Sequence, residues 1–142
     1  MRHFYCFLGM LAICIISGIS SADNLPVVVV NPKVDPKPFL SRSAFSAIFG
    51  MRLRKWEDGS QIKVFVLPDD SHLHIDFSKN ILRVFPYQLR LAWDRLVFSG
   101  TGEEPTKLKS EQQMRELVGS TPGAIGYLSR SMIDETVKAI NF

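Results

Sequence analysis

One short segment in the middle of the sequence holds the residues best suited to bind a ligand. Residues 64–67 are apolar, residues 68–71 have the composition of a tight turn, and residues 72–84 form an amphipathic stretch. This order predicts a strand, a turn and the first turn of a helix. Unpaired backbone N–H groups and the positive end of the helix dipole make such a corner attractive to anions. The segment therefore predicts a site for a small oxyanion.

The expected donors at this corner are the hydroxyl of Ser71 and the backbone N–H groups of His72, Leu73 and His74. Asp70 is the expected acceptor for a proton carried by the ligand. Ser71 is also a residue type that favours the N-cap position of a helix, so its hydroxyl is expected to cap the helix with or without a ligand.

The same stretch raises the alternative of a metal site, because it combines two histidines with several aspartates. On a helix His72 and His74 would point in different directions, whereas on a strand they would share a face. His72 and Asp76 have the i, i+4 spacing of a surface pair. No third ligand has a fixed spacing, and no serine lies in a nucleophile elbow. We therefore expect no metal, no cofactor and no catalysis.

The first 22 residues have the pattern of a secretory signal peptide. A short basic start is followed by an apolar run over residues 4–19, and Ser20 and Ala22 place small residues before a cleavage point at Asp23. The run is shorter than the ~20 residues that span a bilayer, so we expect no stable membrane anchor after cleavage. Both cysteines lie within the leader, so the mature chain would contain no disulfide.

The remaining residues, 23–142, suit a single domain with an ordinary hydrophobic core. Removal of Arg2 lowers the formal net charge of +3 by one, and the sequence contains no long basic block. This charge pattern gives no indication of a nucleic-acid partner.

Strand and helix patterns alternate along this domain. The β-branched run at residues 26–31 predicts a central strand of a parallel sheet, buried on both faces. Ser41, Pro86 and Ser110 mark three helix starts. Further strands are expected at residues 61–67, 125–128 and 136–140. The order favours an α/β fold with a short, mostly parallel sheet flanked by helices.

Several short motifs occur along the chain in an order that is typical of one protein family. They are the segment at residues 45–50, Trp56 with an Asp-Gly pair at 58–59, Trp93 with residues 98–100, Pro105, and the sequence PGAIGY at residues 122–127. In order and approximate spacing they resemble the periplasmic phosphate-binding proteins of ABC transporters, over about residues 26–130. The resemblance implies a type II periplasmic-binding-protein fold, and the length corresponds to roughly one of its two lobes.

At the strand–turn–helix corner that family carries an arginine and, at a fixed distance, the sequence Ser-Gly-Thr. This chain keeps the serine as Ser71 and has Leu67, His72 and Leu73 at the arginine, glycine and threonine positions. The resemblance implies an exported protein that binds phosphate or a similar oxyanion.

Two functions follow as hypotheses. The first is a periplasmic solute-binding protein that holds an oxyanion at the corner and works with the membrane component of an ABC transporter. The second is a non-catalytic interaction module that has kept the fold without phosphate binding. It would dock an envelope partner through the charged loop at residues 52–58, or form a homodimer that rebuilds a cleft.

Overall fold

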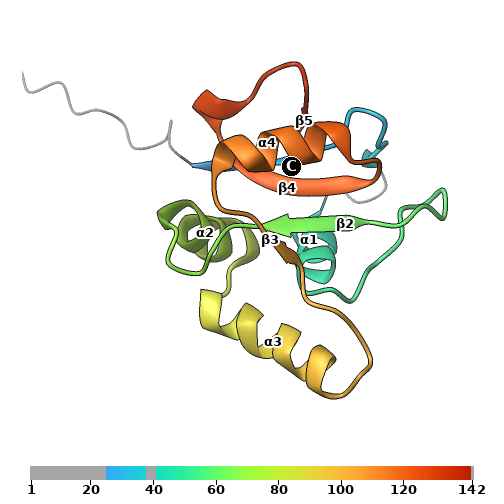
Figure 1. Ribbon diagram of the computed structural model, residues 1–142, viewed down its shortest axis with the longest axis vertical. Helices are drawn as coiled ribbons and strands as arrows, with labels where there is room; N and C mark the ends of the chain where they lie inside the picture. Colours follow the sequence, from blue (N-terminus) through green and yellow to red (C-terminus); the bar gives the residue numbers. More distant parts are fainter. Residues whose placement is uncertain (1–24, 38–40, 142) are drawn as a thin grey trace, which may run out of the picture.

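The computed structural model describes residues 25–37 and 41–141. The predicted leader at residues 1–22 lies outside the described residues, and the domain limits 23–142 remain a prediction. Figure 1 shows a twisted sheet with helices against both of its faces. The elements in chain order are β1 (Pro26–Val30), α1 (Arg42–Phe49), β2 (Lys63–Val66), α2 (His72–Asp76), the π-helix η3 (Phe77–Leu82), α3 (Pro86–Phe98), β3 (Thr106–Lys107), α4 (Glu111–Ser120), β4 (Ala124–Ser129), the 3₁₀ helix η4 (Arg130–Met132) and β5 (Lys138–Ile140).

The five strands lie in the order β3-β2-β4-β1-β5. β2 pairs in parallel with both β3 and β4, whereas β1 pairs antiparallel with both β4 and β5. Four strands of this sheet therefore run in one direction and β1 runs against them. The expected α/β fold with a mostly parallel sheet is confirmed. The expectation that residues 26–31 form a parallel strand is wrong, although β1 is interior and buried along its whole length.

The two faces of the sheet bury different sets of side chains, because successive residues of a strand point to opposite faces. On β4, a side chain at Gly126 would run into Met114 and Val118 of α4, so glycine allows α4 to lie close to the sheet. The next residue, Tyr127, faces the other way and stacks on Phe77 of η3, with ring centroids 3.9 Å apart. α4 thus covers one face of the sheet, and α1 with η3 covers the other.

The helices begin where local signals place them. Ser41 and Ser110 cap α1 and α4 by accepting hydrogen bonds from Ala44 and Gln113 N–H groups. Pro86 is the first residue of α3, as expected. α3 lies at one end of the molecule (Figure 1) and is anchored by the buried Trp93, whose indole N–H donates to the carbonyl oxygen of Phe49 at 2.8 Å. No helix of the described part of the chain is long and apolar enough to cross a membrane.

The stretch at residues 72–84 is not the single amphipathic α-helix that the sequence predicts. After five residues of α2 the backbone widens into the π-helix η3, which ends at Arg83 in the left-handed conformation. The wider turns move the buried face, so that His74, Ser78 and Leu82 are buried with Phe77. A regular α-helix would place Leu73, Phe77, Ile81 and Val84 on one apolar face, and of these four only Phe77 is fully buried.

Candidate functional site

The strand–turn–helix corner exists and lies at the carboxyl end of β2. Ser71 is the N-cap of α2, and its hydroxyl accepts a hydrogen bond from the His74 N–H at 3.4 Å. Its own N–H donates to the carbonyl oxygen of Pro68 at 3.0 Å, which closes the turn. Ligands in open α/β sheets bind beyond the carboxyl ends of the parallel strands. The corner therefore occupies the position in the fold where a ligand is expected.

The predicted site residues are close in sequence but differ in exposure. Ser71 and Leu73 are half-buried, Asp70 and His72 are exposed, and His74 is buried. The His74 N–H is engaged by the cap, whereas those of His72 and Leu73 have no hydrogen-bond partner among the described residues. The corner thus offers two free N–H groups and the Ser71 hydroxyl to a ligand.

The side chain of His74 turns inward and belongs to the core. Its Nδ1 lies 2.5 Å from the hydroxyl oxygen of Tyr127, which also accepts a hydrogen bond from the Leu67 N–H at 2.8 Å. With one donor already directed at that oxygen, the Tyr127 O–H can donate to Nδ1, which leaves the His74 proton on Nε2. Burial lowers the pKa of His74, and burial also raises the pKa of Tyr127. Both groups are therefore neutral near pH 7.

An arginine from another helix reaches this corner, which the sequence analysis did not anticipate. Arg90 of α3 forms an ion pair with Asp69 at 2.5 Å, and this hydrogen bond raises the pKa of Arg90. The two side chains are about one-third exposed, at 34% and 36%, yet Arg90 Nε and Asp69 Oδ1 are buried without a partner. His74 Nε2 is buried without a partner as well. Two donors and one acceptor thus remain unpaired beside the turn.

No sequence signal pointed to this pair, because Arg90 follows Asp69 by 21 residues and the two lie on different elements. The two histidines of the metal alternative do not point toward a common site. His72 is exposed and His74 is buried, so their side chains diverge as expected for a helix. Within residues 25–37 and 41–141 no group of three or more His, Cys, Asp or Glu side chains could hold a metal ion.

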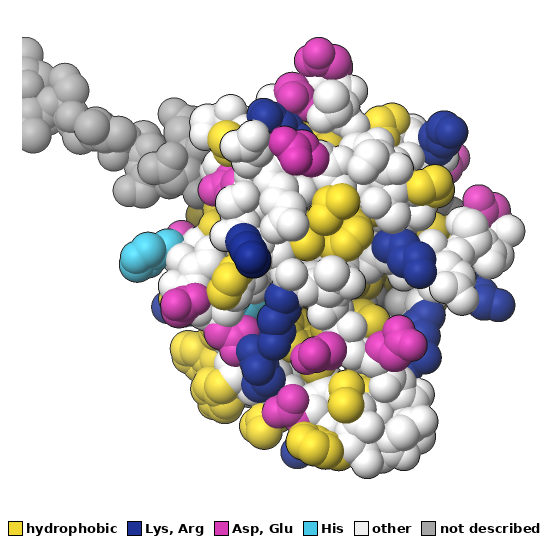
Figure 2. Space-filling view, in the orientation of Figure 1, with side chains coloured by type: hydrophobic (Ala, Val, Ile, Leu, Met, Phe, Trp, Pro, Cys, Tyr) yellow, Lys and Arg dark blue, Asp and Glu magenta, His cyan; other side chains and the backbone are white. Residues whose placement is uncertain are grey.

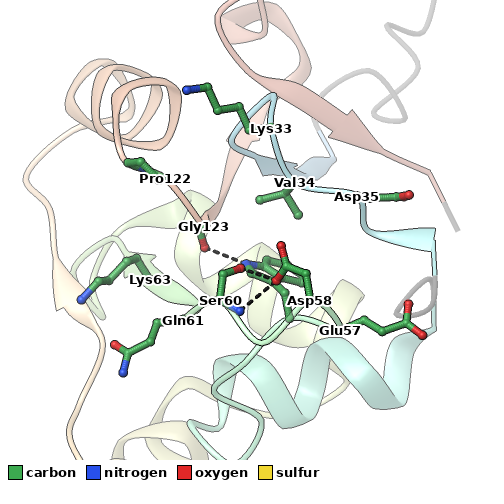
Figure 3. Close-up of a pocket in the computed structure, with 11 residues that line it drawn as sticks. Lys33, Val34, Asp35, Glu57, Asp58, Ser60, Gln61, Lys63, Pro122 and Gly123 are labelled. Carbon is green, nitrogen blue, oxygen red and sulfur yellow. Dashed lines mark hydrogen bonds between the residues drawn. The ribbon is translucent and has the colours of Figure 1, made fainter.

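A hollow of about 650 Å³ lies at the opposite edge of the sheet, where β2 and β4 begin (Figure 3). Three segments line it, and two of them carry lysine and carboxylate side chains, including Lys33, Lys63 and Asp58. Trp56 lies against its wall and donates its indole N–H to the Gly123 carbonyl oxygen at 3.0 Å. Trp56 is 5% exposed, which makes it a core residue.

No family model matches the chain, and no curated protein sequence matches it. Solved structures do share its fold. An ABC-type phosphate transport receptor from Vibrio cholerae superposes with a TM-score of 0.63 at 20% identity, covering 84% of this chain and 46% of the receptor. A phosphate ABC transporter substrate-binding protein from Clostridium perfringens, solved with bound phosphate, gives a TM-score of 0.64 at 19% identity, covering 83% and 44%.

PstS from Borrelia burgdorferi gives a TM-score of 0.56 at 12% identity, covering 83% of this chain and 47% of that protein. The chain therefore spans less than half of the length of each of these three proteins. Over most of its own length it has the fold of the substrate-binding proteins of phosphate ABC transporters, in the portion that corresponds to one lobe.

Proposed function

We propose that the protein is an exported, non-catalytic solute-binding protein that holds a small oxyanion, with phosphate as the first candidate, at the β2–α2 corner. The observation that carries the proposal is the position of Arg90, which brings a guanidinium to a corner that already presents free N–H groups. The fold shared with phosphate-transport proteins supports the same class of ligand.

In this proposal Ser71 and the N–H groups of His72 and Leu73 hold the oxygens of the anion. Arg90, whose charge Asp69 already pairs, adds guanidinium N–H donors. The His74 N–H orients Ser71 through the cap and does not reach the ligand. Asp70 is exposed and next to the cap, so its carboxylate can accept a proton from a partly protonated anion. Leu67 occupies the position where the resembling family has its arginine, and Arg90 is the residue that compensates.

A single lobe leaves the corner open to solvent on one side, and small-ligand sites in proteins are mostly enclosed. The part of the fold described here corresponds to less than half of the solved neighbours, and in this proposal an opposing wall completes the site. A second copy of this protein or the membrane component of an ABC transporter in the periplasm would supply that wall.

Thermal unfolding of the purified protein with phosphate, sulfate or chloride at matched ionic strength tests the proposal. A ligand at ~100 times its dissociation constant adds ~2.7 kcal/mol, which corresponds to several degrees for a domain of this size. We expect a phosphate-specific rise that is lost in Ser71→Asp, because aspartate keeps the N-cap but repels an anion. Arg90→Gln should also remove the rise, whereas Arg130→Gln on the exposed η4 should keep it. A flat response of the unmodified protein to all three anions contradicts the proposal.

A second candidate function is an interaction module without phosphate binding. Among the described residues, five of the six large apolar side chains that are exposed lie on or beside α3, and the sixth is Leu25: the five are Phe85, Tyr87, Leu91, Val97 and Phe98. Figure 2 shows hydrophobic side chains over the lower end of the molecule, where Figure 1 places α3. This function would be favoured if sedimentation shows a dimer that forms as the protein concentration rises and if phosphate leaves the melting temperature unchanged.

A further inference from the structure

A second hollow lies beside the end of η3, between α3 and the segment that follows α1. It is a groove of about 490 Å³, a volume within the range of small-molecule sites. Its walls come from the end of α1, the end of η3 and the length of α3, and none of the corner residues from Asp69 to His74 lines it. The groove is therefore separate from the proposed oxyanion site.

The floor of the groove is apolar and held in place. Leu82, Leu89 and Leu96 lie along it, and the first two are only 3% and 7% exposed. The hydrogen bond from Trp93 to the Phe49 carbonyl ties α3 to the end of α1. Because its two walls are fixed to each other, the groove needs no rearrangement to accept a ligand, which favours binding.

The polar lining of the groove is positive. Its twelve lining residues include Arg52, which follows α1, and Arg95, which lies on α3, but no carboxylate. Neither arginine forms an ion pair with a carboxylate of the described residues. Ser99 and Thr101, also in the lining, bond to each other at 2.7 Å, so their hydroxyls are partly satisfied. The two guanidinium groups are thus the charged partners available to a ligand.

We propose that this groove binds an anionic amphiphile, with a carboxylate head group held by Arg52 and Arg95 and an unbranched apolar tail on the leucine floor. Guanidinium groups recognise carboxylates through paired, charge-assisted hydrogen bonds. Leu91, which is exposed and lies one helical turn before Arg95 on α3, extends the apolar surface beyond the groove. This ligand differs from the oxyanion at the corner, since it requires an apolar body.

A second copy of the chain fits the groove less well. In a two-fold dimer the same patch is used by both copies, so Arg52 and Arg95 of one copy would approach those of the other. Like charges placed together across an interface oppose association. The unpaired positive charge therefore favours a separate anionic ligand over self-association at this surface.

Decanoate is a suitable probe, with decanol as the neutral control, each kept below the concentration at which it forms aggregates. We expect decanoate to raise the melting temperature of the full protein and to shift the backbone amide resonances of residues 82–101 in two-dimensional NMR. Decanol should bind at least tenfold more weakly, because it lacks the charge that the arginines recognise. Arg52→Gln and Arg95→Gln should each weaken decanoate binding about tenfold, the effect of one charge-assisted hydrogen bond.

Two variants serve as controls for this experiment. Arg130→Gln removes an exposed arginine remote from the groove and should leave decanoate binding unchanged. Ser71→Asp should also retain it, which separates the groove from the phosphate test at the corner. The proposal is overturned if decanoate does not bind, if decanol binds equally well, or if both groove arginines can be replaced without loss. A dimer that forms through α3 and excludes decanoate would overturn it in favour of a second copy.

Discussion

The hydroxyl of Tyr127 is the hydrogen-bond partner of one buried backbone N–H group and one buried side-chain nitrogen. Tyr127→Phe should therefore lower the free energy of unfolding by more than the removal of a single oxygen atom suggests. Phenylalanine keeps the ring and its stack on Phe77. It leaves the Leu67 N–H and His74 Nδ1 unpaired, both at a buried position. Each buried polar group without a partner costs about 1–3 kcal/mol, so we expect a loss of about 2–5 kcal/mol.

This loss is large against the ~5–15 kcal/mol that stabilises a typical domain, and it corresponds to a fall in melting temperature of about 8–20 °C. Urea unfolding followed by circular dichroism would measure it. Tyr87→Phe is the matched control: Tyr87 is 62% exposed and should change stability by less than about 0.5 kcal/mol. If Tyr127→Phe also loses less than about 0.5 kcal/mol, the hydroxyl does not satisfy these groups and the reasoning is refuted.

Three further predictions concern the buried polar groups and the turns. Burial lowers the pKa of His74 below its unfolded value, so unfolding binds a proton and stability should fall as the pH drops below about 6.5, by up to about 1.4 kcal/mol per pH unit. Urea unfolding at pH 7.5 and 5.5 should show this slope reduced in His74→Gln and kept in His72→Gln, where the side chain is exposed. Gly123→Ala should unfold at a much lower urea concentration than Gly59→Ala. Both glycines have positive φ, but only at Gly123 would the new methyl group overlap a backbone carbonyl oxygen. Equal losses of stability in the two variants would contradict this explanation. Asn31→Asp should lower the free energy of unfolding by about 2–4 kcal/mol at pH 7 and by less at pH 4. The amide of Asn31 donates to two carbonyl oxygens at the end of α4, and an aspartate can donate only when its carboxyl is protonated. A loss of stability that does not depend on pH would exclude this explanation.

The sequence was sufficient where a structural feature depends on near neighbours. Ser41, Ser110 and Pro86 act within one helical turn, and each begins a helix as predicted. The unbroken apolar character of β1 predicted its burial because burial depends on the residue types themselves. The direction of β1 could not be predicted in this way, since it is set by partners about a hundred residues further along the chain.

Two other differences have similar physical causes. The change from α2 to the wider η3 accompanies the burial of His74 in the core. His74 can be buried there because the hydroxyl of Tyr127, on a strand far away in the sequence, is its hydrogen-bond partner. β3 is only two residues long, too short to show an alternating pattern. At the candidate site the sequence located Ser71 correctly as a cap, but the Arg90–Asp69 ion pair joins two elements that only the fold brings together.

The interior position of β1 also constrains how the protein folds as it is made. Among the described residues β1 is the first strand, and its pairing partners are β4 and β5, the last two. A chain that emerges from its N-terminus therefore cannot close the middle of its sheet until residues 124–140 have appeared. Contacts at such large separation in sequence slow folding, because loop closure costs entropy before any contact forms. The topology thus leaves β1 without its two neighbouring strands until residues 124–140 have been synthesised.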